Sequence, residues 1–304
     1  MPQYTAVARI PRFSLLLILV GVAAISSAAV LIREADAPPL VIAASRMLIA
    51  SVVILPFAVG RLKNTFKILE SPDAWLIIVA GAALALHFWL WITSLSHTSI
   101  ASSVVLVTSH PAMVAVLSFV LWRERLGHAA VLGILVAFAG LIVINLGSFS
   151  FGSSVFEGNL MALAAAGAMA GYLLAGRHIR ERIDALSYLA MVYALAAILL
   201  LAAAFIAGES FQGYSVKTYW MLALLGLVPQ LIGHTSLNLA VRRLPATVVS
   251  VAILGEPVGA TLLGWAVLGE APGIKEVVGG LIILCGILMV VGGGGGGRES
   301  LEQM

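Results

Sequence analysis

Ten apolar stretches follow one another along this chain, and only short connections separate them. A helix of about 20 apolar residues crosses the ~30 Å hydrocarbon core of a bilayer. Helices are favoured there because hydrocarbon offers no hydrogen-bond partner to the backbone, so each segment must satisfy its own polar groups. The sequence therefore predicts an all-α membrane protein with ten transmembrane helices, at 13–32, 40–59, 74–96, 99–122, 128–147, 157–176, 186–207, 217–241, 245–268 and 273–291.

Composition excludes a soluble enzyme. Hydrophobic residues make up 61% of the 304 residues and charged residues 10%, whereas soluble domains carry roughly 25% charged residues. The chain contains no Walker A sequence, HExxH motif or paired cysteines, which would indicate a nucleotide or metal site. We therefore expect no catalytic residues, no metal and no cofactor. An intramembrane enzyme is the alternative from another functional class.

Lysine and arginine gather on one side of the predicted membrane. With the N-terminus in the cytoplasm, thirteen of these cations fall inside and three outside, and Arg46 lies within a helix, which accounts for all 17. Cytoplasmic connections of membrane proteins carry an excess of Lys and Arg, so both termini are expected in the cytoplasm. The net charge of +3 then reflects membrane orientation, and no nucleic-acid partner is implied.

The two halves of the chain carry the same pattern of residues 146 positions apart. A proline is followed by a glutamate and two glycines at offsets of 13, 22 and 29, as Pro111, Glu124, Gly133 and Gly140 and again as Pro257, Glu270, Gly279 and Gly286. Five helices per half is an odd number, so the second half must enter the membrane from the opposite side, as an inverted repeat. We expect a first repeat at 1–150, a second at 151–291 and a flexible glycine-rich tail at 292–304.

Three features occur together: the spacing Pro111-x12-Glu124 with downstream glycines, its copy from Glu256-Pro257-Val258 to Leu268-Gly269-Glu270, and Arg46 followed by Ala50 and Pro56. In this combination the chain resembles the EamA-type repeat of the drug/metabolite transporter (DMT) superfamily, and within it most resembles the YddG-like exporters of aromatic amino acids. The resemblance implies two inverted five-helix repeats in the bacterial inner (cytoplasmic) membrane, a central cavity and export by alternating access. One departure is that Val192 lies 146 positions after Arg46, so only the first half carries the intramembrane cation.

Polar and aromatic residues inside the predicted helices mark a candidate substrate site. A charged or hydrogen-bonding group at midplane depth requires a partner or a water-filled cavity, and rings supply flat apolar contact. Such a mixture suits an aromatic or large neutral solute with one polar end. The residues predicted to line a midplane cavity are His87, Trp91, Tyr172, Gln230, His234 and Glu256.

Each of these residues has a structural alternative. Trp91 could belong to the aromatic belt at the membrane surface, whereas Trp89, on the opposite face of its helix, is expected in the belt or against lipid. Gln230 and His234 could hydrogen-bond to neighbouring helices without meeting a substrate. Glu256 could be protonated and bonded to a neighbouring helix, or it could bind a substrate ammonium or relay a proton.

Three further residues are assigned to conformational change: Arg46, Pro111 and Pro257. Each proline falls near the centre of its helix and removes a backbone donor, which predicts a hinge or a break that faces the cavity; the alternative is a static kink. Arg46 lies roughly 9 Å from the outer end of its helix, where it snorkels to the membrane surface, pairs with an acid at an outer gate or contacts a substrate carboxylate. Glu124 and Glu270 fall at helix ends and are expected to be boundary residues.

Glycines at helical spacing predict close helix packing, because small residues let two backbones approach each other. The sequence contains two such sets: the GxxxG pair Gly167 and Gly171, and the repeated pairs Gly133/Gly140 and Gly279/Gly286. We expect both sets to lie at helix contacts.

The sequence thus predicts a membrane transporter that exports amino acids, aromatic or large neutral ones, and related metabolites. An exporter of cationic drugs with the same fold is the alternative. Without an ATP site, the driving force must be the gradient of the substrate or of a coupled ion. The expected partners are the small-molecule substrate and membrane lipids, and a monomer suffices because the two halves complete the inverted pair.

Overall fold

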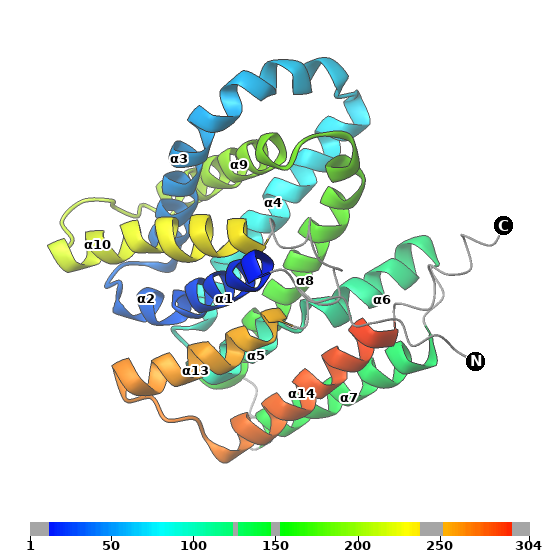
Figure 1. Ribbon diagram of the computed structural model, residues 1–304. Helices are drawn as coiled ribbons and strands as arrows, with labels where there is room; N and C mark the ends of the chain where they lie inside the picture. Colours follow the sequence, from blue (N-terminus) through cyan, green and yellow to red (C-terminus); the bar gives the residue numbers. More distant parts are fainter. Residues whose placement is uncertain (1–11, 124–126, 147–152, 238–251, 294–304) are drawn as a thin grey trace.

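The computed structural model describes residues 12–123, 127–146, 153–237 and 252–293, and within these residues every regular element is a helix (Figure 1). The helices are, in chain order, α1 Arg12–Ser26, α2 Ala28–Glu34, α3 Pro39–Ile68, α4 Ser71–Ser94, α5 Ile100–Val107, α6 His110–Trp122, α7 His128–Asn145, α8 Ser154–Arg182, α9 Ala185–Ile206, α10 Val216–Leu225, η1 Gly226–His234, α13 Gly255–Leu268 and α14 Ile274–Gly293. The predicted all-α fold class is confirmed for this part of the chain.

Seven described segments are long and apolar enough to cross a membrane: Phe13–Glu34, Pro39–Ile68, Ser71–Ser94, Ile100–Leu121, Ser154–Arg177, Ala185–Ile206 and Val216–Leu237. A shorter apolar helix covers Val131–Ile144. Together they correspond to the first eight predicted stretches. The total of ten stays a prediction, since residues 238–251, which include the start of the ninth stretch, lie outside the described part, as do residues 294–304 of the predicted tail.

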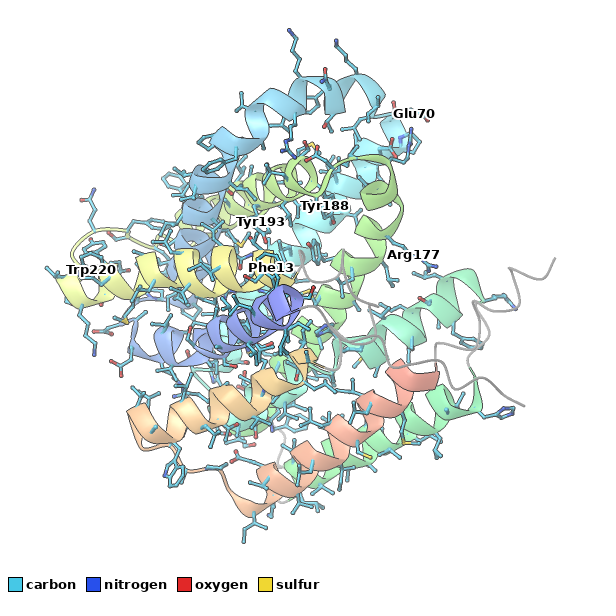
Figure 2. The ribbon with its side chains drawn as sticks, viewed as in Figure 1. Phe13, Glu70, Arg177, Tyr188, Tyr193 and Trp220 are labelled. Carbon is cyan, nitrogen blue, oxygen red and sulfur yellow. The ribbon has the colours of Figure 1, made fainter. Side chains whose placement is uncertain are left out.

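The outer surface of the bundle is apolar. Phe57, Phe138, Trp220 and Trp265 are each at least 59% exposed. In Figure 2 the side chain of Trp220 extends away from α10, whereas Tyr193 lies within the bundle. An apolar surface of this extent is unfavourable in water but is the surface expected against lipid.

Three of the first eight predicted membrane helices depart from a continuous α-helix in the described residues. The first is interrupted at Ser27, between α1 and α2, and the fourth at Thr108 and Ser109, between α5 and α6. The eighth changes from α to π geometry at Gly226, where η1 begins. Such departures are tolerated at membrane depth only where the freed backbone groups find partners within the protein or in a cavity.

At the interruption before Pro111, a side chain supplies a partner of this kind to a freed backbone group. A proline at this position frees the carbonyl group one turn earlier, that of Val107. The ring of His110 meets this carbonyl at 3.3 Å and donates to it through Nδ1. Pro111 therefore lies in the first turn of α6 instead of kinking a continuous helix, and Pro257 likewise lies in the first turn of α13. Whether the two prolines act as hinges stays a prediction.

Four glycines bring α7 and α14 into close contact, as their repeated spacing predicted. A Cβ atom added to Gly140 would lie 2.6 Å from the carbonyl oxygen of Gly279, and one added to Gly286 would lie 2.5 Å from that of Gly133. Any side chain at these positions would force the two backbones apart. The two helices run side by side at one edge of the bundle (Figure 1), and this part of the glycine prediction is confirmed.

The GxxxG pair of α8 does not bring two described backbones into close contact. A Cβ atom on Gly167 would meet no described atom within 4 Å, and one on Gly171 would meet only the Cβ atom of Ala83, at 3.8 Å. Gly171 thus faces α4 at ordinary contact distance, whereas no described helix packs on Gly167, because glycine spacing creates a face of small residues but does not specify whether another helix lies against it.

One end of the bundle is held by ion pairs between α8 and the α3–α4 connection. Arg182 donates to Asp73 at 2.7 Å and also lies 3.2 Å from Glu70. The side chain of Asp73 is only 3% exposed. Asp73 also accepts the backbone N–H of Glu70 at 3.0 Å, which forms a capping box at the start of α4. The ion pairs therefore fix the end of α8 against the start of α4.

Asp184 caps α9, where its carboxylate accepts the backbone N–H groups of Leu186 and Ser187 at 3.1 Å each. Burial raises the pKa of Asp184, but the hydrogen bonds of Ser187 and Arg61 outweigh burial, so the net pKa lies below its usual value. Because its pKa is lower in the folded protein than in the unfolded chain, the carboxylate stabilises the fold at pH values above the pKa of the unfolded chain. This contribution is lost as the pH falls through the folded-state pKa.

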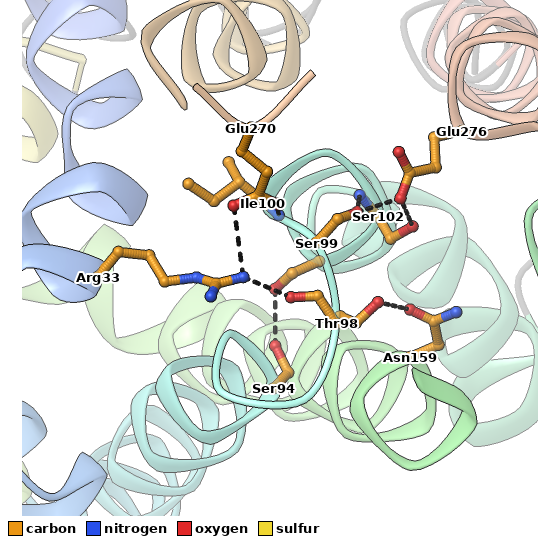
Figure 3. A network of polar contacts seen from close by, with 10 residues as sticks. Arg33, Ser94, Thr98, Ser99, Ile100, Ser102, Asn159, Glu270 and Glu276 are labelled. Carbon is orange, nitrogen blue, oxygen red and sulfur yellow. Dashed lines mark hydrogen bonds and ion pairs between the residues drawn. The ribbon is translucent and has the colours of Figure 1, made fainter. Parts of the chain in front are cut away.

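The opposite end of the bundle carries a network of polar contacts, shown in Figure 3. Glu270, which follows α13, accepts the backbone N–H of Ile100 at 2.6 Å and lies 3.5 Å from Arg33. Arg33 in turn donates to the carbonyl oxygen of Thr98 at 2.8 Å. Glu270 is therefore a boundary residue, as the sequence predicted. Its counterpart Glu124 lies outside the described residues.

The same network continues onto α14 and α8. Glu276 accepts hydrogen bonds from the hydroxyl groups of Ser99 and Ser102, and the hydroxyl group of Thr98 donates to Asn159 at 2.8 Å. We call these contacts the Glu270/Glu276 network; it consists of Arg33, Thr98, Ser99, Ile100, Ser102, Asn159, Glu270 and Glu276. It ties α2, α5, α8, α13 and α14 together at one end.

Candidate functional site

A cavity of about 280 Å³ lies inside the bundle. Its wall is formed by residues from α1 to α4, the junction of α5 and α6, α8, α9, η1 and the start of α13. Ligand pockets in proteins commonly measure about 300–1,000 Å³. The cavity therefore has room for a small solute and not for a large one.

All the residues predicted to bind substrate line this cavity: His87 and Trp91 from α4, Tyr172 from α8, Gln230 and His234 from η1, and Glu256 from α13. Of the three residues assigned to conformational change, Arg46 lines the cavity, whereas Pro111 and Pro257 do not. The fold thus brings residues of both halves to one place. That they bind a substrate stays a prediction.

Arg46 lies on α3 with only 1% of its surface exposed. Its Nε donates to Oε1 of Gln230 at 2.8 Å, and its guanidinium carbon lies 4.2 Å from the centroid of the Phe88 ring. Snorkelling is therefore the wrong interpretation, because an amide and an aromatic face take the place of water around this charge. Arg46 also forms no ion pair with any described acid.

The π-helix η1 places Gln230 against Arg46. Gly226, at the start of η1, packs so tightly on α3 that an added Cβ atom would lie 2.6 Å from the side chain of Ile49. Pro229 lies within η1 and lacks the N–H that a regular α-helix would use. Short π-helical segments are rare and often occur at functional sites. Gln230 itself is 1% exposed.

Rings from α4 form one wall of the cavity. His87 stacks on Trp91 with 6.2 Å between ring centroids and meets Phe88 edge to face at 4.8 Å. Nδ1 of His87 donates to the carbonyl oxygen of Ala165 at 2.9 Å, which leaves Nε2 as an acceptor in the neutral ring. Trp89, by contrast, is 42% exposed, as the helical period predicted.

An ionisable residue precedes each of the two central prolines. His110 comes before Pro111 and Glu256 before Pro257, 146 residues apart, and both ionisable residues line the cavity. Glu256 forms no ion pair within the described part of the chain. There, too, no group of three or more His, Cys, Asp or Glu side chains is placed to hold a metal ion.

The sequence-based prediction of the site omits Phe88, His110 and Tyr193, which also line the cavity. His110 could have been found from its offset of 146 to Glu256. Phe88 is adjacent to His87 but falls about 100° away on a helix, so the helical period favoured a different face. Tyr193 is 3% exposed on α9, where no polar stripe draws attention to it.

Comparison with known proteins identifies relatives of this chain. The model of the EamA-like transporter family matches residues 12–146 and again residues 156–292. The uncharacterized transporter YetK of Bacillus subtilis (strain 168) is 28% identical over 253 residues, which cover 78% of this chain and 76% of YetK. The uncharacterized transporter YwfM of the same organism is 26% identical over 267 residues and 84% of each chain.

A solved structure, described only as the crystal structure of a protein, has the same fold. It superimposes with a TM-score of 0.64 over 91% of this chain and 95% of its own, at 21% sequence identity. At this identity the likeness concerns the fold alone. The family model, in contrast, matches most of the sequence in two copies, and the matched residues include all those that line the cavity. This chain therefore belongs to the EamA-like transporter family and is a multi-pass membrane transporter.

Proposed function

We propose that the protein exports amino acids, aromatic or large neutral ones, and related metabolites by alternating access. The observation that carries this proposal is the mixed wall of the cavity, where aromatic rings lie beside a buried guanidinium and a neutral amide. The rings offer flat apolar contact to a large side chain. Arg46 and Gln230 offer hydrogen bonds to a polar end group.

The cationic-drug alternative has less support. Arg46 places a positive charge in the cavity wall, and Glu256 is the one acid among the residues that line it. A lipophilic cation would meet a like charge in surroundings of low dielectric constant, where repulsion is strong. An intramembrane enzyme has less support still, because the family to which the chain belongs is one of transporters.

We infer that the chain forms ten transmembrane helices in two inverted five-helix repeats, at 1–150 and 151–291. Two matches to one family model support an internal repeat. If a two-fold axis exchanges the halves, each helix contact should have a counterpart in the other half. α3 packs on its own counterpart α9, and α7 packs on its own counterpart α14. The contact between α4 and α8 corresponds to the contact between η1 and α1. Such halves can exchange conformations and open a central site to either side in turn. Since both halves belong to one chain, a monomer surrounded by lipid is sufficient.

We propose a bacterial inner-membrane location with both termini in the cytoplasm, from the distribution of Lys and Arg. After replacement of the exposed Cys285, a single cysteine at Gln212, between α9 and α10, should react with a membrane-impermeant maleimide in intact cells. A cysteine at Lys67, at the end of α3, should react only after the cells are lysed. The reverse pattern would show that the orientation is inverted.

Counterflow in proteoliposomes tests the proposed function. Vesicles loaded with unlabelled phenylalanine should accumulate labelled phenylalanine faster than protein-free vesicles, since the cavity accepts the ring and the polar end together. Vesicles loaded with tetraphenylphosphonium should show no comparable exchange of that cation. Exchange of the cation without exchange of phenylalanine or another large neutral amino acid would favour the multidrug alternative.

A further inference from the structure

Arg46 has more hydrogen-bond donors than the acceptors that reach it among the described residues. A guanidinium carries five N–H donors, and among the described residues only Gln230 accepts a hydrogen bond from Arg46, through Nε. In the described part of the chain, Nη1 of Arg46 is enclosed without a partner, and so is Nε1 of Trp91. The centroid of the Trp91 ring lies 5.7 Å from the guanidinium carbon. Two enclosed donors on neighbouring side chains therefore lack an acceptor among the described residues.

Aromatic contact offsets only part of this deficit. The Phe88 ring lies 4.2 Å from the guanidinium carbon, and a cation over a ring face is attracted to it. A ring face is nevertheless a poor substitute for the hydrogen bonds that a buried charge loses when it leaves water. Nearly all buried donors in proteins have a partner. The missing partner of Arg46 is best supplied by an anion that enters the cavity.

Glu256 does not fill this role. It lines the same cavity, but within the described chain it forms no ion pair with Arg46. Its carboxyl oxygens are also not among the enclosed atoms that lack a partner. Enclosed donors without an acceptor thus lie at Arg46 and Trp91, whereas no oxygen of Glu256 is both enclosed and without a donor. A group that lines the cavity can be hydrated there, but an enclosed donor cannot, so the lack of a partner costs more at Arg46. This difference favours a substrate that is recognised by its carboxylate over one that is recognised by its ammonium group.

We propose that Arg46 and Trp91 form the carboxylate-binding end of the transport site and that the amino group of the substrate is dispensable. The ligand class is an aromatic monocarboxylate, whether an amino acid, a 2-oxo acid or an aryl alkanoic acid. Guanidinium groups bind carboxylates through two parallel N–H bonds. Gln230 also holds Arg46 in place, because its Oε1 accepts from Nε and leaves the terminal nitrogens of Arg46 to the ligand. Since the two donors that lack an acceptor, Nη1 of Arg46 and Nε1 of Trp91, are both enclosed, one of the two side chains must rotate when the ligand enters.

This inference rests on the proposed transport function and is tested first with analogues that share one ring. 3-Phenylpropionate lacks the amine of phenylalanine, whereas phenethylamine and phenylalaninamide lack the carboxylate. In counterflow of labelled phenylalanine, 3-phenylpropionate should compete about as well as unlabelled phenylalanine. The two amines should be about 10- to 150-fold weaker, which is the effect of losing a charged hydrogen bond.

Variants of the two donors form the second test. Arg46→Met keeps much of the side-chain volume but no donor, so the affinities for phenylalanine and 3-phenylpropionate should both fall about 10- to 150-fold. Arg46→Lys keeps the charge without the planar fork of N–H donors, so its affinity for both ligands should lie between those of the parent and Arg46→Met. Trp91→Phe keeps a ring and removes Nε1, so this variant should bind both ligands with lower affinity than the parent. Its matched control is Trp89→Phe on the exposed face of the same helix, which should bind at the parental affinity.

Direct binding separates the failure of this inference from the failure of the proposed function. Calorimetric titration of 3-phenylpropionate into the purified protein in detergent measures the carboxylate site without any flux. If phenylalanine is not transported but 3-phenylpropionate binds to the parent and not to monodisperse Arg46→Met, the transport proposal fails and the carboxylate site is supported.

The carboxylate site is wrong if 3-phenylpropionate does not bind to the parent, or if phenethylamine competes equally well. It is also wrong if monodisperse Arg46→Met binds 3-phenylpropionate at the parental affinity. Should Arg46→Met fail to fold, the comparison of Trp91→Phe with Trp89→Phe and the analogues on the parent protein decide the question.

Discussion

Replacing Gly286 by alanine should lower the free energy of unfolding by about 3 kcal/mol, the upper part of the range for overpacked sites. The added Cβ atom would lie 2.5 Å from both the carbonyl oxygen of Gly133 and the backbone nitrogen of Ala137. Backbone atoms cannot rotate out of the way as a side chain can, so α7 and α14 must separate. The free energy of unfolding is measured by titrating the folded protein in mixed micelles with a denaturing detergent while circular dichroism monitors the helix content.

Gly60→Ala is the matched control. Gly60 lies in α3, and a Cβ atom there would meet no described atom within 4 Å. Alanine is favoured over glycine in a helix by roughly 1 kcal/mol, so this variant should be as stable as the parent or more stable. If both alanine variants shift stability in the same direction, the close approach of α7 and α14 is not what the glycine at position 286 provides.

Replacing Arg182 by glutamine should lower the free energy of unfolding by about 2 kcal/mol, between the effects of breaking an exposed and a buried ion pair, because Arg182 is 35% exposed and Asp73 is buried. The carboxylate of Asp73 is 3% exposed and would lose the donor that lies 2.7 Å away. The effect is also limited because Asp73 still accepts the backbone N–H of Glu70 and lies at a helix N-terminus, which favours negative charge.

Two variants isolate this ion pair. Asp73→Asn combined with Arg182→Gln should recover much of the lost stability, since the amide of asparagine needs no counter-charge. Arg61→Gln should change stability by less than about 1 kcal/mol, because its contact with Asp184 is 3.5 Å long and its side chain is 62% exposed. A double variant as unstable as Arg182→Gln alone would show that the buried charge is not the cause.

The positions of the membrane helices could be predicted from the sequence because hydrophobicity alone determines them. The stretch predicted at 186–207 is α9, Ala185–Ile206, and the stretch predicted at 74–96 is α4, Ser71–Ser94. The helical period also predicted which residues of α4 face inward: His87 and Trp91 are buried and Trp89 is exposed. Neither inference requires knowledge of another helix.

Features that depend on a partner helix could not be predicted. The π geometry of η1 accompanies the tight contact of Gly226 with Ile49 on α3, and the two residues lie in opposite halves of the chain. The burial of Arg46 depends likewise on Gln230 and Phe88. From depth alone, Arg46 could equally have reached the membrane surface.

The Glu270/Glu276 network has a consequence for how readily that end of the bundle opens. The side chains of Arg33 and Glu270 are 33% and 27% exposed in their ion pair, so water is already close to both charges. Partly hydrated pairs contribute about 0–1 kcal/mol each, since water replaces the contact that is lost, so the Arg33–Glu270 pair adds little to the free energy of opening. An open arrangement that lay a few kcal/mol higher would be populated at roughly 0.1–10% by thermal motion alone. Salt would raise that population by screening the charges, and a solute gradient could then drive net flux without any nucleotide.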